Sequence, residues 1–242
     1  MRLDKLFTTV GLLSRRETAI AVRRGEITVD GATARRADMQ VDPTHSSVTL
    51  RGEPVIYREF VYLWLNKPEG YVSATEDGRL PVVTELAPPE YQRLSLFPCG
   101  RLDRDTVGLL LLTNDGALSH ALLSPRRAVP KVYRFKVGAP LPATSEERLA
   151  EGMQLSGERC KPALLTADAD RMGGTVILTE GKYHEVKRMM SALGAPIVFL
   201  ERCAFAGIPL DPDLPRGQTR PLREDEITTL QIAAGITNAP NE

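Results

Sequence analysis

One stretch of the sequence decides the fold: Gly100-Arg-Leu-Asp-Arg-Asp-Thr-Val-Gly-Leu-Leu-Leu-Leu-Thr-Asn-Asp-Gly116. Leu109 to Leu112 form an unbroken apolar run that ends in a turn-forming Asn-Asp-Gly sequence, which predicts a strand buried on both faces. Charged residues crowd the entrance to this strand, namely Arg101, Asp103, Arg104 and Asp105. Charge beside a buried element is unfavourable unless it is paired or used. These residues therefore form either a solvated loop with local ion pairs or a carboxylate site at the mouth of a cleft.

The composition is that of an ordinary globular protein. The chain has 242 residues, 42% of them apolar, and its 31 basic and 31 acidic side chains give a formal net charge of zero. A basic surface for nucleic acid must therefore be local. The chain begins without an apolar signal segment, and no apolar run approaches the roughly 20 residues that cross a bilayer, so we expect a cytoplasmic protein. The three cysteines and three histidines form no metal-binding pattern.

The first 59 residues resemble a separate small domain in their patterning. Apolar residues at helical spacing predict a helix over 3–10, and Ser14-Arg-Arg-Glu17 is a capping box that begins a second helix ending near Arg24. An Asp30-Gly31 turn suits a tight hairpin. The second helix carries four arginines that share one face: Arg15, Arg16, Arg23 and Arg24. Such a face either is simply solvated or binds the phosphates of a nucleic acid.

After a linker that ends near residue 60, strands and helices follow one another. The apolar pattern predicts strands over 61–65, 109–113, 131–137, 163–166 and 175–179, and helices over 117–123, 144–152 and 184–193. In the 131–137 strand, Tyr133 falls on the apolar face, where it is either a core residue or part of a site. The helix that begins at His184 carries cations against its dipole, which favours a phosphate as partner. These cations are Lys182, His184, Lys187 and Arg188.

Two sets of motifs resemble known families. Arg2-Leu-Asp-Lys, Ser14-Arg-Arg and Arg24-Gly-Glu-Ile-Thr-Val-Asp-Gly31 are together similar to the S4-type RNA-binding module. The stretch from Gly100 to Gly116 resembles the signature of RNA pseudouridine synthases. Three flanking pieces match that family in its order: Asn66-Lys67-Pro68-x-Gly70, Lys131-x-Tyr133 and Glu180-Gly-Lys-Tyr-His184-x-Val-Lys187-Arg188-Met189. Ser124-Pro-Arg126 and Arg220-Pro-Leu-x-Glu-x-Glu-Ile227 look most like the branch that modifies small-subunit (16S) rRNA, although large-subunit relatives share most motifs.

The resemblance implies an α+β fold in two domains. We expect a small α-helical S4-like RNA-binding domain over 1–59 and a pseudouridine synthase domain over 60–232, with a disordered tail over 233–242. The second domain should contain a mixed, mostly antiparallel β-sheet with flanking helices. The active cleft is expected across this sheet, at the entrance of the 109–113 strand.

The resemblance also implies a reaction, the isomerisation of a uridine to pseudouridine in ribosomal RNA by a monomer. The N1 glycosidic bond breaks and C5 of the rotated base bonds to the sugar, which requires neither a metal nor another cofactor. Asp103 is expected either to attack the ribose carbon or to remove a sugar proton. Lys187 is expected to hold this carboxylate ionised, with Arg101 as second candidate. Tyr133 should stack on the base and help to deprotonate C5, and Leu193 should complete the apolar pocket wall.

A uridine in folded RNA must be flipped out to reach such a pocket, with the RNA backbone held on both sides. The residues expected to hold the RNA are Arg15, Arg16, Arg23, Arg24, Lys67, Arg126, Arg127, Lys182, His184 and Arg188. A non-catalytic rRNA-binding protein is an alternative, but it would leave residues 60–232 without a role. A metal-dependent nuclease could use Asp103, Asp105 and Asp115, although the leucine run between them makes an awkward metal cage.

Overall fold

The computed structural model describes residues 1–57, 59–155 and 157–236, and the chain divides into two compact units. Unit 1 consists of Met1–Val61 and Ala87–Leu96, and unit 2 consists of Tyr62–Leu86 and Phe97–Glu242. The division is thus not a single cut near residue 60, because a segment from the middle of the chain clusters with the first unit. In this segment Arg93 contacts Glu17 at 3.4 Å. Of the expected tail, residues 233–234 complete a helix, and residues 237–242 lie outside the described residues.

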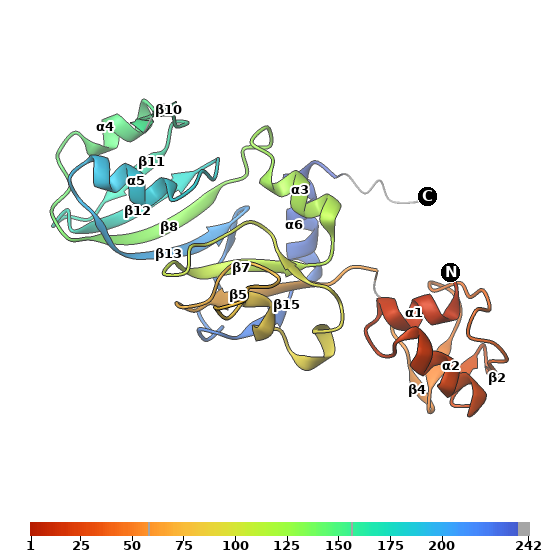
Figure 1. The fold of residues 1–242 in the computed structure, drawn as a ribbon. Coiled ribbons are helices and arrows are strands. Elements are labelled where there is room, and N and C mark those ends of the chain that lie inside the picture. Colours follow the sequence, from red (N-terminus) through yellow and green to blue (C-terminus); the bar gives the residue numbers. More distant parts are fainter. Residues whose placement is uncertain (58, 156, 237–242) are drawn as a thin grey trace. The chain divides into compact units, whose positions relative to one another are not determined.

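Unit 1 contains two helices, α1 (Leu3–Thr9) and α2 (Arg15–Arg23) (Figure 1). The expected capping box is present at the start of α2, where the Ser14 hydroxyl accepts from the Glu17 amide and the Glu17 carboxylate accepts from the Ser14 amide. This reciprocal pairing satisfies two helix-end groups and defines where α2 begins. The arginines of α2, Arg15, Arg16 and Arg23, are all exposed.

A small sheet completes unit 1, with strand order β2-β1-β3-β4. Its strands are β1 (Ile27–Val29), β2 (Ala32–Thr33), β3 (Val48–Leu50) and β4 (Glu53–Pro54). Asp30 and Gly31 both have positive φ, as a tight hairpin between right-twisted strands requires. The helices and the sheet enclose a core that belongs to this unit, and Leu3, Phe7 and Ile27 in it are fully buried.

Unit 2 is built on one large mixed sheet in the order β11-β12-β8-β13-β7-β5-β15, with β6 added to β7 and β14 added to β13. Its strands are β5 (Tyr62–Lys67), β6 (Phe97–Pro98), β7 (Val107–Thr113), β8 (Lys131–Val137), β11 (Leu164–Ala167), β12 (Gly173–Leu178), β13 (Ile197–Phe205), β14 (Ile208–Pro209) and β15 (Thr219–Pro221). The described pairings are antiparallel except that of β13 with β7, which is parallel. This confirms the mixed, mostly antiparallel sheet and the α+β class. A separate hairpin joins β9 (Gln154–Leu155) and β10 (Glu158–Arg159).

Helices flank this sheet. The helices α3 (Gly116–Leu123) and α6 (Glu224–Ala234) lie side by side in Figure 1 and share a core with Trp64, Leu109 and Leu111. Helix α4 (Ser145–Ala150) packs on β11, and α5 (Glu185–Ala192) packs on β13. Two 3₁₀ helices cover Val83–Leu86 and Pro89–Tyr91. No helix among the described residues is long and apolar enough to span a membrane.

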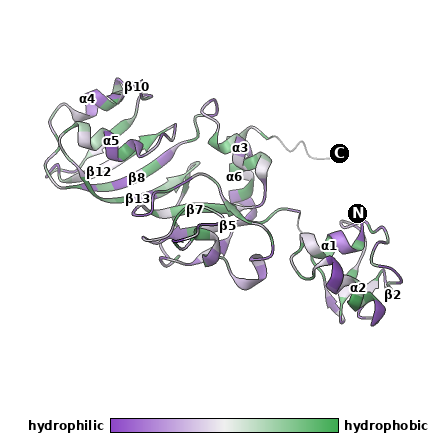
Figure 2. Cartoon of the chain, viewed as in Figure 1, coloured by the Kyte–Doolittle hydropathy of each residue, from purple (hydrophilic) through white to green (hydrophobic). Residues whose placement is uncertain are grey.

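Strand β7 is a fully buried interior strand of the sheet, as its leucine run predicts. All seven of its residues are buried, and Figure 2 shows it as strongly hydrophobic. Near its start, Gly108 has a φ of 102°, and a Cβ atom there would lie 2.4 Å from the backbone oxygen of Arg202. Only glycine fits both this conformation and this approach. Gly108 therefore lets β13 pass close to the entrance of β7.

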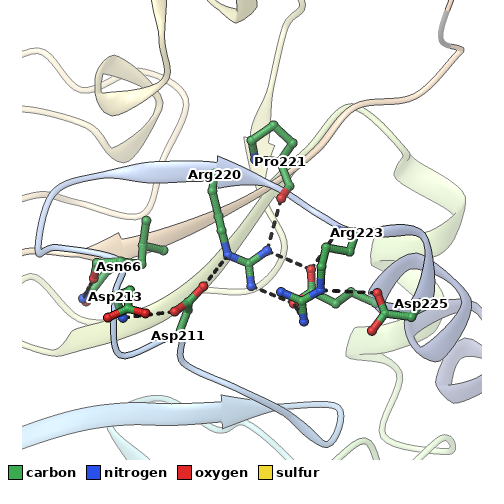
Figure 3. A network of polar contacts seen from close by, with 9 residues as sticks. Asn66, Asp211, Asp213, Arg220, Pro221, Arg223 and Asp225 are labelled. Atoms are coloured by element: carbon green, nitrogen blue, oxygen red, sulfur yellow. Dashed lines mark hydrogen bonds and ion pairs between the residues drawn. The ribbon is translucent and has the colours of Figure 1, made fainter.

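A polar network joins β15 to the start of α6 (Figure 3). Arg220 donates to Asp211 at 2.9 Å and to the two carboxylate oxygens of Glu226 at 2.7 and 2.8 Å. Glu226 is 3% exposed and also accepts from the Arg223 amide at 2.8 Å. Arg220 and Glu226 belong to the motif that resembles the small-subunit branch. Their contacts attach the edge strand of the sheet to the last described helix.

Candidate active site

A pocket of about 440 Å³ opens in unit 2 at the entrance of β7, where the sequence predicts the cleft. Its walls come from the loop 100–106, from β8 and β13, and from the segment 180–187 that leads into α5. The apolar part of the wall consists of Leu102, Leu123, Leu178, Val186 and Leu200. The pocket therefore combines an apolar surface with the charged residues that precede β7.

The Asp103 carboxylate meets two basic side chains in this pocket. The Nζ of Lys187 lies 2.8 Å from Oδ2 of Asp103, and the Nε2 of His184 lies 3.3 Å from Oδ1. Lys187 also contacts Asp105 at 2.5 Å. Burial lowers the pKa of Lys187, but the two carboxylates outweigh burial and raise it. Lys187 therefore pairs with Asp103 inside the pocket, which is the contact expected from the sequence.

Two other residues considered as partners of Asp103 have different surroundings. Arg101 lines the pocket with an exposed side chain, and within the described parts of the chain it makes no ion pair. Asp115 caps α3 by accepting from the Leu118 amide at 2.9 Å, and it accepts from the Tyr62 hydroxyl at 2.8 Å. Because Asp115 is engaged there, it does not complete the carboxylate cage that a two-metal nuclease needs.

Lys67 does not lie on an RNA-facing surface, so that expectation was wrong. The side chain is fully buried, and its amine donates to the backbone oxygens of Pro68, Asp103, Arg104 and Thr106 at 2.8–3.2 Å. Burial lowers the pKa of Lys67 to about 8. Three of these acceptors belong to the turn that carries Asp103. Lys67 therefore fixes that turn from inside the protein.

Tyr133 lies on β8 beside two buried cations. It is 9% exposed and lines the pocket, as does Arg202, its partner in the β8–β13 register. Arg202 is 2% exposed and donates from Nε to the Leu109 carbonyl at 2.7 Å. Burial raises the pKa of Tyr133, and the charge of Arg202 opposes that shift. Lys131 also lines the pocket, is 6% exposed, and donates to the Val129 carbonyl at 3.1 Å.

Sequence reasoning missed the role of Arg202 in the pocket. The only signal is an arginine inside an otherwise largely apolar stretch, Ile197–Phe205, and a charged residue normally indicates an exposed position. The residue becomes conspicuous once β13 is placed in the centre of the sheet, between β7 and β8.

An acidic group lies behind the segment 180–187. Glu185 is 4% exposed and accepts from the Lys182 amide at 2.9 Å. Burial, with the neighbouring Glu180 carboxylate, raises the pKa of Glu185 to about 7. The ligand atoms of Cys160, Glu180 and Glu185 lie within 4.8 Å of one another. These groups could hold a cation only after losing protons, and burial raises the pKa of the Cys160 thiol as well.

The basic residues expected to hold RNA differ in their exposure and in whether their side chains already donate hydrogen bonds within the protein. The four arginines of the α2 region, Arg15, Arg16, Arg23 and Arg24, are exposed, as are Arg126 and Arg127 in unit 2. Lys182 donates instead to the Arg159 carbonyl at 2.7 Å, and Arg188 donates to the Leu155 carbonyl at 3.0 Å. These two side chains hold loops of unit 2 together.

The rim of the pocket carries an aromatic pair. His184 stacks on Tyr183 with ring centroids 3.8 Å apart, and Tyr183 is 68% exposed. His184 therefore connects an exposed ring to the Asp103 carboxylate, which it contacts through Nε2.

Leu193 is a second correction. It is 5% exposed and ends α5, but it is not among the residues that line the pocket. It belongs to the expected buried stripe of α5, with Val186, Met189 and Met190. Of these four side chains, Val186, two residues after His184, is the one that lines the pocket.

Comparison with known proteins assigns this architecture to a family. The sequence profile described as RNA pseudouridylate synthase matches residues 61–192. The chain is 45% identical to a Bacillus subtilis protein named uncharacterized RNA pseudouridine synthase YtzG, over 95% of this chain and 98% of that one. It is 39% identical to ribosomal small subunit pseudouridine synthase A of Escherichia coli, over 95% of this chain and all of that one. A crystal structure of a pseudouridylate synthase matches with a TM-score of 0.67 at 34% identity, covering 95% of this chain and 99% of that one.

Proposed function

The chain belongs to the RNA pseudouridylate synthase family and is an isomerase that acts on RNA, and we propose that its substrate is a uridine of small-subunit (16S) ribosomal RNA. The Escherichia coli relative that aligns over its whole length is named for that subunit. The alternative within the same family is a uridine of large-subunit rRNA. The S4-like character of unit 1 is part of the same proposal, because the family profile covers residues 61–192 only.

The observation that carries the proposed mechanism is the contact between Asp103 and Lys187, 2.8 Å apart at the pocket mouth. Both routes open to Asp103 use a carboxylate whose position is fixed, and the ion pair with Lys187 supplies that fixed position. In one route Asp103 attacks C1′ of the ribose; in the other it removes the C2′ proton. Lys67 supports either route, because its amine fixes the turn that carries Asp103.

Tyr133 and the apolar wall are proposed to receive the flipped base. An aromatic ring that lines the pocket can stack on uracil, and its hydroxyl can assist removal of the C5 proton in the last step. The apolar side chains around it keep water away from the sugar carbon, where water would yield an abasic site. Leu178 and Leu200 belong to this wall.

The RNA around the flipped uridine is proposed to contact the exposed arginines of α2 and, in unit 2, Arg126 and Arg127. Guanidinium groups bind phosphates by charge and by paired hydrogen bonds. The exposed Tyr183 ring at the rim can stack on an unpaired neighbouring base.

The test is Asp103→Asn, assayed by tritium release from 5-tritiated uridine in 16S and 23S rRNA transcripts. We expect this variant to fold and to bind RNA with unchanged affinity, but to release no tritium. Asp105→Asn is the matched control, since Asp105 contacts the same amine; it should retain most of the activity. Normal turnover by Asp103→Asn would remove Asp103 from the mechanism.

The substrate is tested separately by mapping pseudouridines in rRNA from cells that lack this protein. Loss of one site in 16S rRNA is the expected result. Loss of a site in 23S rRNA alone would overturn the small-subunit proposal and leave the reaction itself in place.

A further inference from the structure

We propose that Arg202 and Lys131 bind the negative charge that the uracil ring carries after its bond to the ribose has broken. This inference rests on the proposed function of the pocket as a uridine site. It assigns to two buried residues a task that neither Asp103 nor Lys187 can perform, because those two charges neutralise each other.

The first observation is that both cations are buried at the pocket without an acidic partner. Arg202 and Lys131 are 2% and 6% exposed, and both line the pocket. Among the residues that the structure describes, neither forms an ion pair with a carboxylate. Both lie over the Phe205 ring, Arg202 at 5.0 Å and Lys131 at 5.8 Å from its centre. Two unneutralised buried cations are strongly unfavourable unless a ligand supplies the opposite charge.

The second observation is an unused hydrogen-bond donor. The Nη2 atom of Arg202 is buried and has no hydrogen-bond partner within the described ranges. Its Nε is held by the Leu109 carbonyl, so the guanidinium cannot turn away from the pocket without losing that bond. A fixed donor with a free N–H group is suited to a carbonyl oxygen that gains charge during a reaction.

The third observation is the position of Arg202 next to Tyr133. The two residues are partners in the β8–β13 register, and Gly108 on β7 allows the close approach that brings β13 there. A base that stacks on Tyr133 would therefore lie beside the guanidinium. Asp103 reaches the pocket from a different element, the loop before β7. The pocket thus separates a carboxylate for the sugar from cations for the base.

The chemistry of the reaction supplies the charge. When the N1–C1′ bond breaks, its electron pair stays with uracil, whose negative charge spreads over N1, O2 and O4. At the sugar, either a carboxylate oxygen of Asp103 forms a bond to C1′, or Asp103 takes the C2′ proton and a C1′=C2′ double bond forms.

The rotated base then gives an electron pair from C5 to C1′. At that moment the Asp103–C1′ bond breaks, or Asp103 returns its proton to C2′. The C5 proton finally leaves and N1 takes up a proton. From cleavage of the N1–C1′ bond until formation of the C5–C1′ bond, the detached base is an anion. Arg202 and Lys131 are placed to stabilise it.

The experiment compares Arg202→Met and Arg202→Lys with the wild-type enzyme in single-turnover reactions on a 16S rRNA fragment. Arg216→Met is the matched control. Arg216 is an exposed arginine outside the pocket, and it pairs with Glu201, the neighbour of Arg202 on β13. We expect Arg202→Met to react about 100-fold more slowly, as for loss of one charge-stabilising donor. Its dissociation constant for RNA should stay within about threefold, because the charge appears only after binding. Its unfolding midpoint should stay near the wild-type value, because removal of an unpaired buried charge offsets loss of the hydrogen bond to the Leu109 carbonyl.

A second measurement does not depend on the folding of Arg202→Met. Fluorine at C5 withdraws electrons and stabilises the uracil anion, so a 5-fluorouridine substrate needs the protein cations less. The slowing caused by Arg202→Lys, measured as loss of the N-linked nucleoside, should therefore be several-fold smaller with 5-fluorouridine than with uridine. Equal slowing with both substrates, or a wild-type rate in Arg202→Met, would overturn this inference while an inactive Asp103→Asn still supported the proposed function. If the wild-type enzyme itself modifies no rRNA, the proposed function fails instead.

Discussion

Two buried lysines of unit 2 have the same chemical group but different surroundings. Burial lowers the pKa of Lys67 and of Lys131 to about 8 in both cases. Lys67 donates to four backbone oxygens, whereas Lys131 donates to one, the Val129 carbonyl. A buried amine whose N–H groups are all used stabilises the protein, and one with unused N–H groups beside a pocket can serve a ligand. Hydrogen bonding, more than burial, thus separates a structural cation from a functional one.

The strongest test of this comparison is Lys67→Met. The change leaves the oxygens around the Asp103 turn without their donor, so we expect the free energy of unfolding to fall by about 3–5 kcal/mol. Activity should be lost with it, since the turn is no longer fixed. Urea denaturation measures the first effect, and tritium release measures the second. A variant as stable as the wild type would show that the four hydrogen bonds are not structural.

Gly108→Ala tests the position of Arg202, which lines the pocket together with Lys131. The added Cβ would lie 2.4 Å from the Arg202 carbonyl at a φ of 102°, so β13 must shift or the backbone must strain. We expect a loss of roughly 2–3 kcal/mol in unfolding free energy, with slower turnover. Gly116→Ala is the matched control, because no atom lies within 4 Å of a Cβ there. Equal stability of the two variants would contradict the close approach of β13 to β7.

Lys131→Met should change the reaction more than the fold. With few hydrogen bonds to lose, its unfolding free energy should stay near the wild-type value, while single-turnover rates fall about tenfold, roughly 1.4 kcal/mol in the barrier. The amine is charged below a pH of about 8 and neutral above it. Wild-type rates should therefore decline as pH rises through 8, and Lys131→Arg should keep its rate there. Identical pH profiles for these two enzymes would contradict a role for the Lys131 charge.

The smallest expected effect concerns Glu185, a buried acid with one satisfied and one unsatisfied oxygen. Its folded pKa of about 7 exceeds the ordinary value of 4.5, so the folded state holds an extra proton between these values. Stability from this group is present below pH 4.5 and is lost as pH rises through 7. Relative to wild type, Glu185→Gln should therefore be more stable at pH 8 than at pH 4. The exposed Glu224→Gln serves as control, and a pH-independent difference in denaturation would contradict the assignment.

Much of the fold follows from local patterns in the sequence. The strand predicted over 131–137 is β8 with the same bounds, and the predicted alternation places Tyr133 on its buried side. The Ser14–Glu17 capping box begins α2 as expected, and the leucine run forms the fully buried β7. These elements can be predicted from the sequence because each one satisfies its own hydrogen-bonding and burial requirements within a few residues.

The features that sequence reasoning missed depend on distant parts of the chain. Glu201 and Arg202 interrupt the apolar pattern of β13, and the burial of Arg202 makes sense only beside β7 and the pocket. Lys67, next to a proline, has the local pattern of a loop residue; its acceptors lie 36 to 39 residues away for three of four bonds. Leu193 shares the spacing of a buried stripe, but spacing does not say which member of a stripe meets a cavity.

The parallel pairing of β7 with β13 has a consequence for synthesis. These strands meet at Val107–Glu201 and Gly108–Arg202, so the pocket closes only when residues nearly a hundred positions apart come together. A ribosome releases the chain from its N-terminus, and long-range pairing of this kind forms late. Unit 1 and the Asp103 turn therefore emerge well before β13. The pocket proposed to bind uridine is therefore incomplete until translation has passed Arg202.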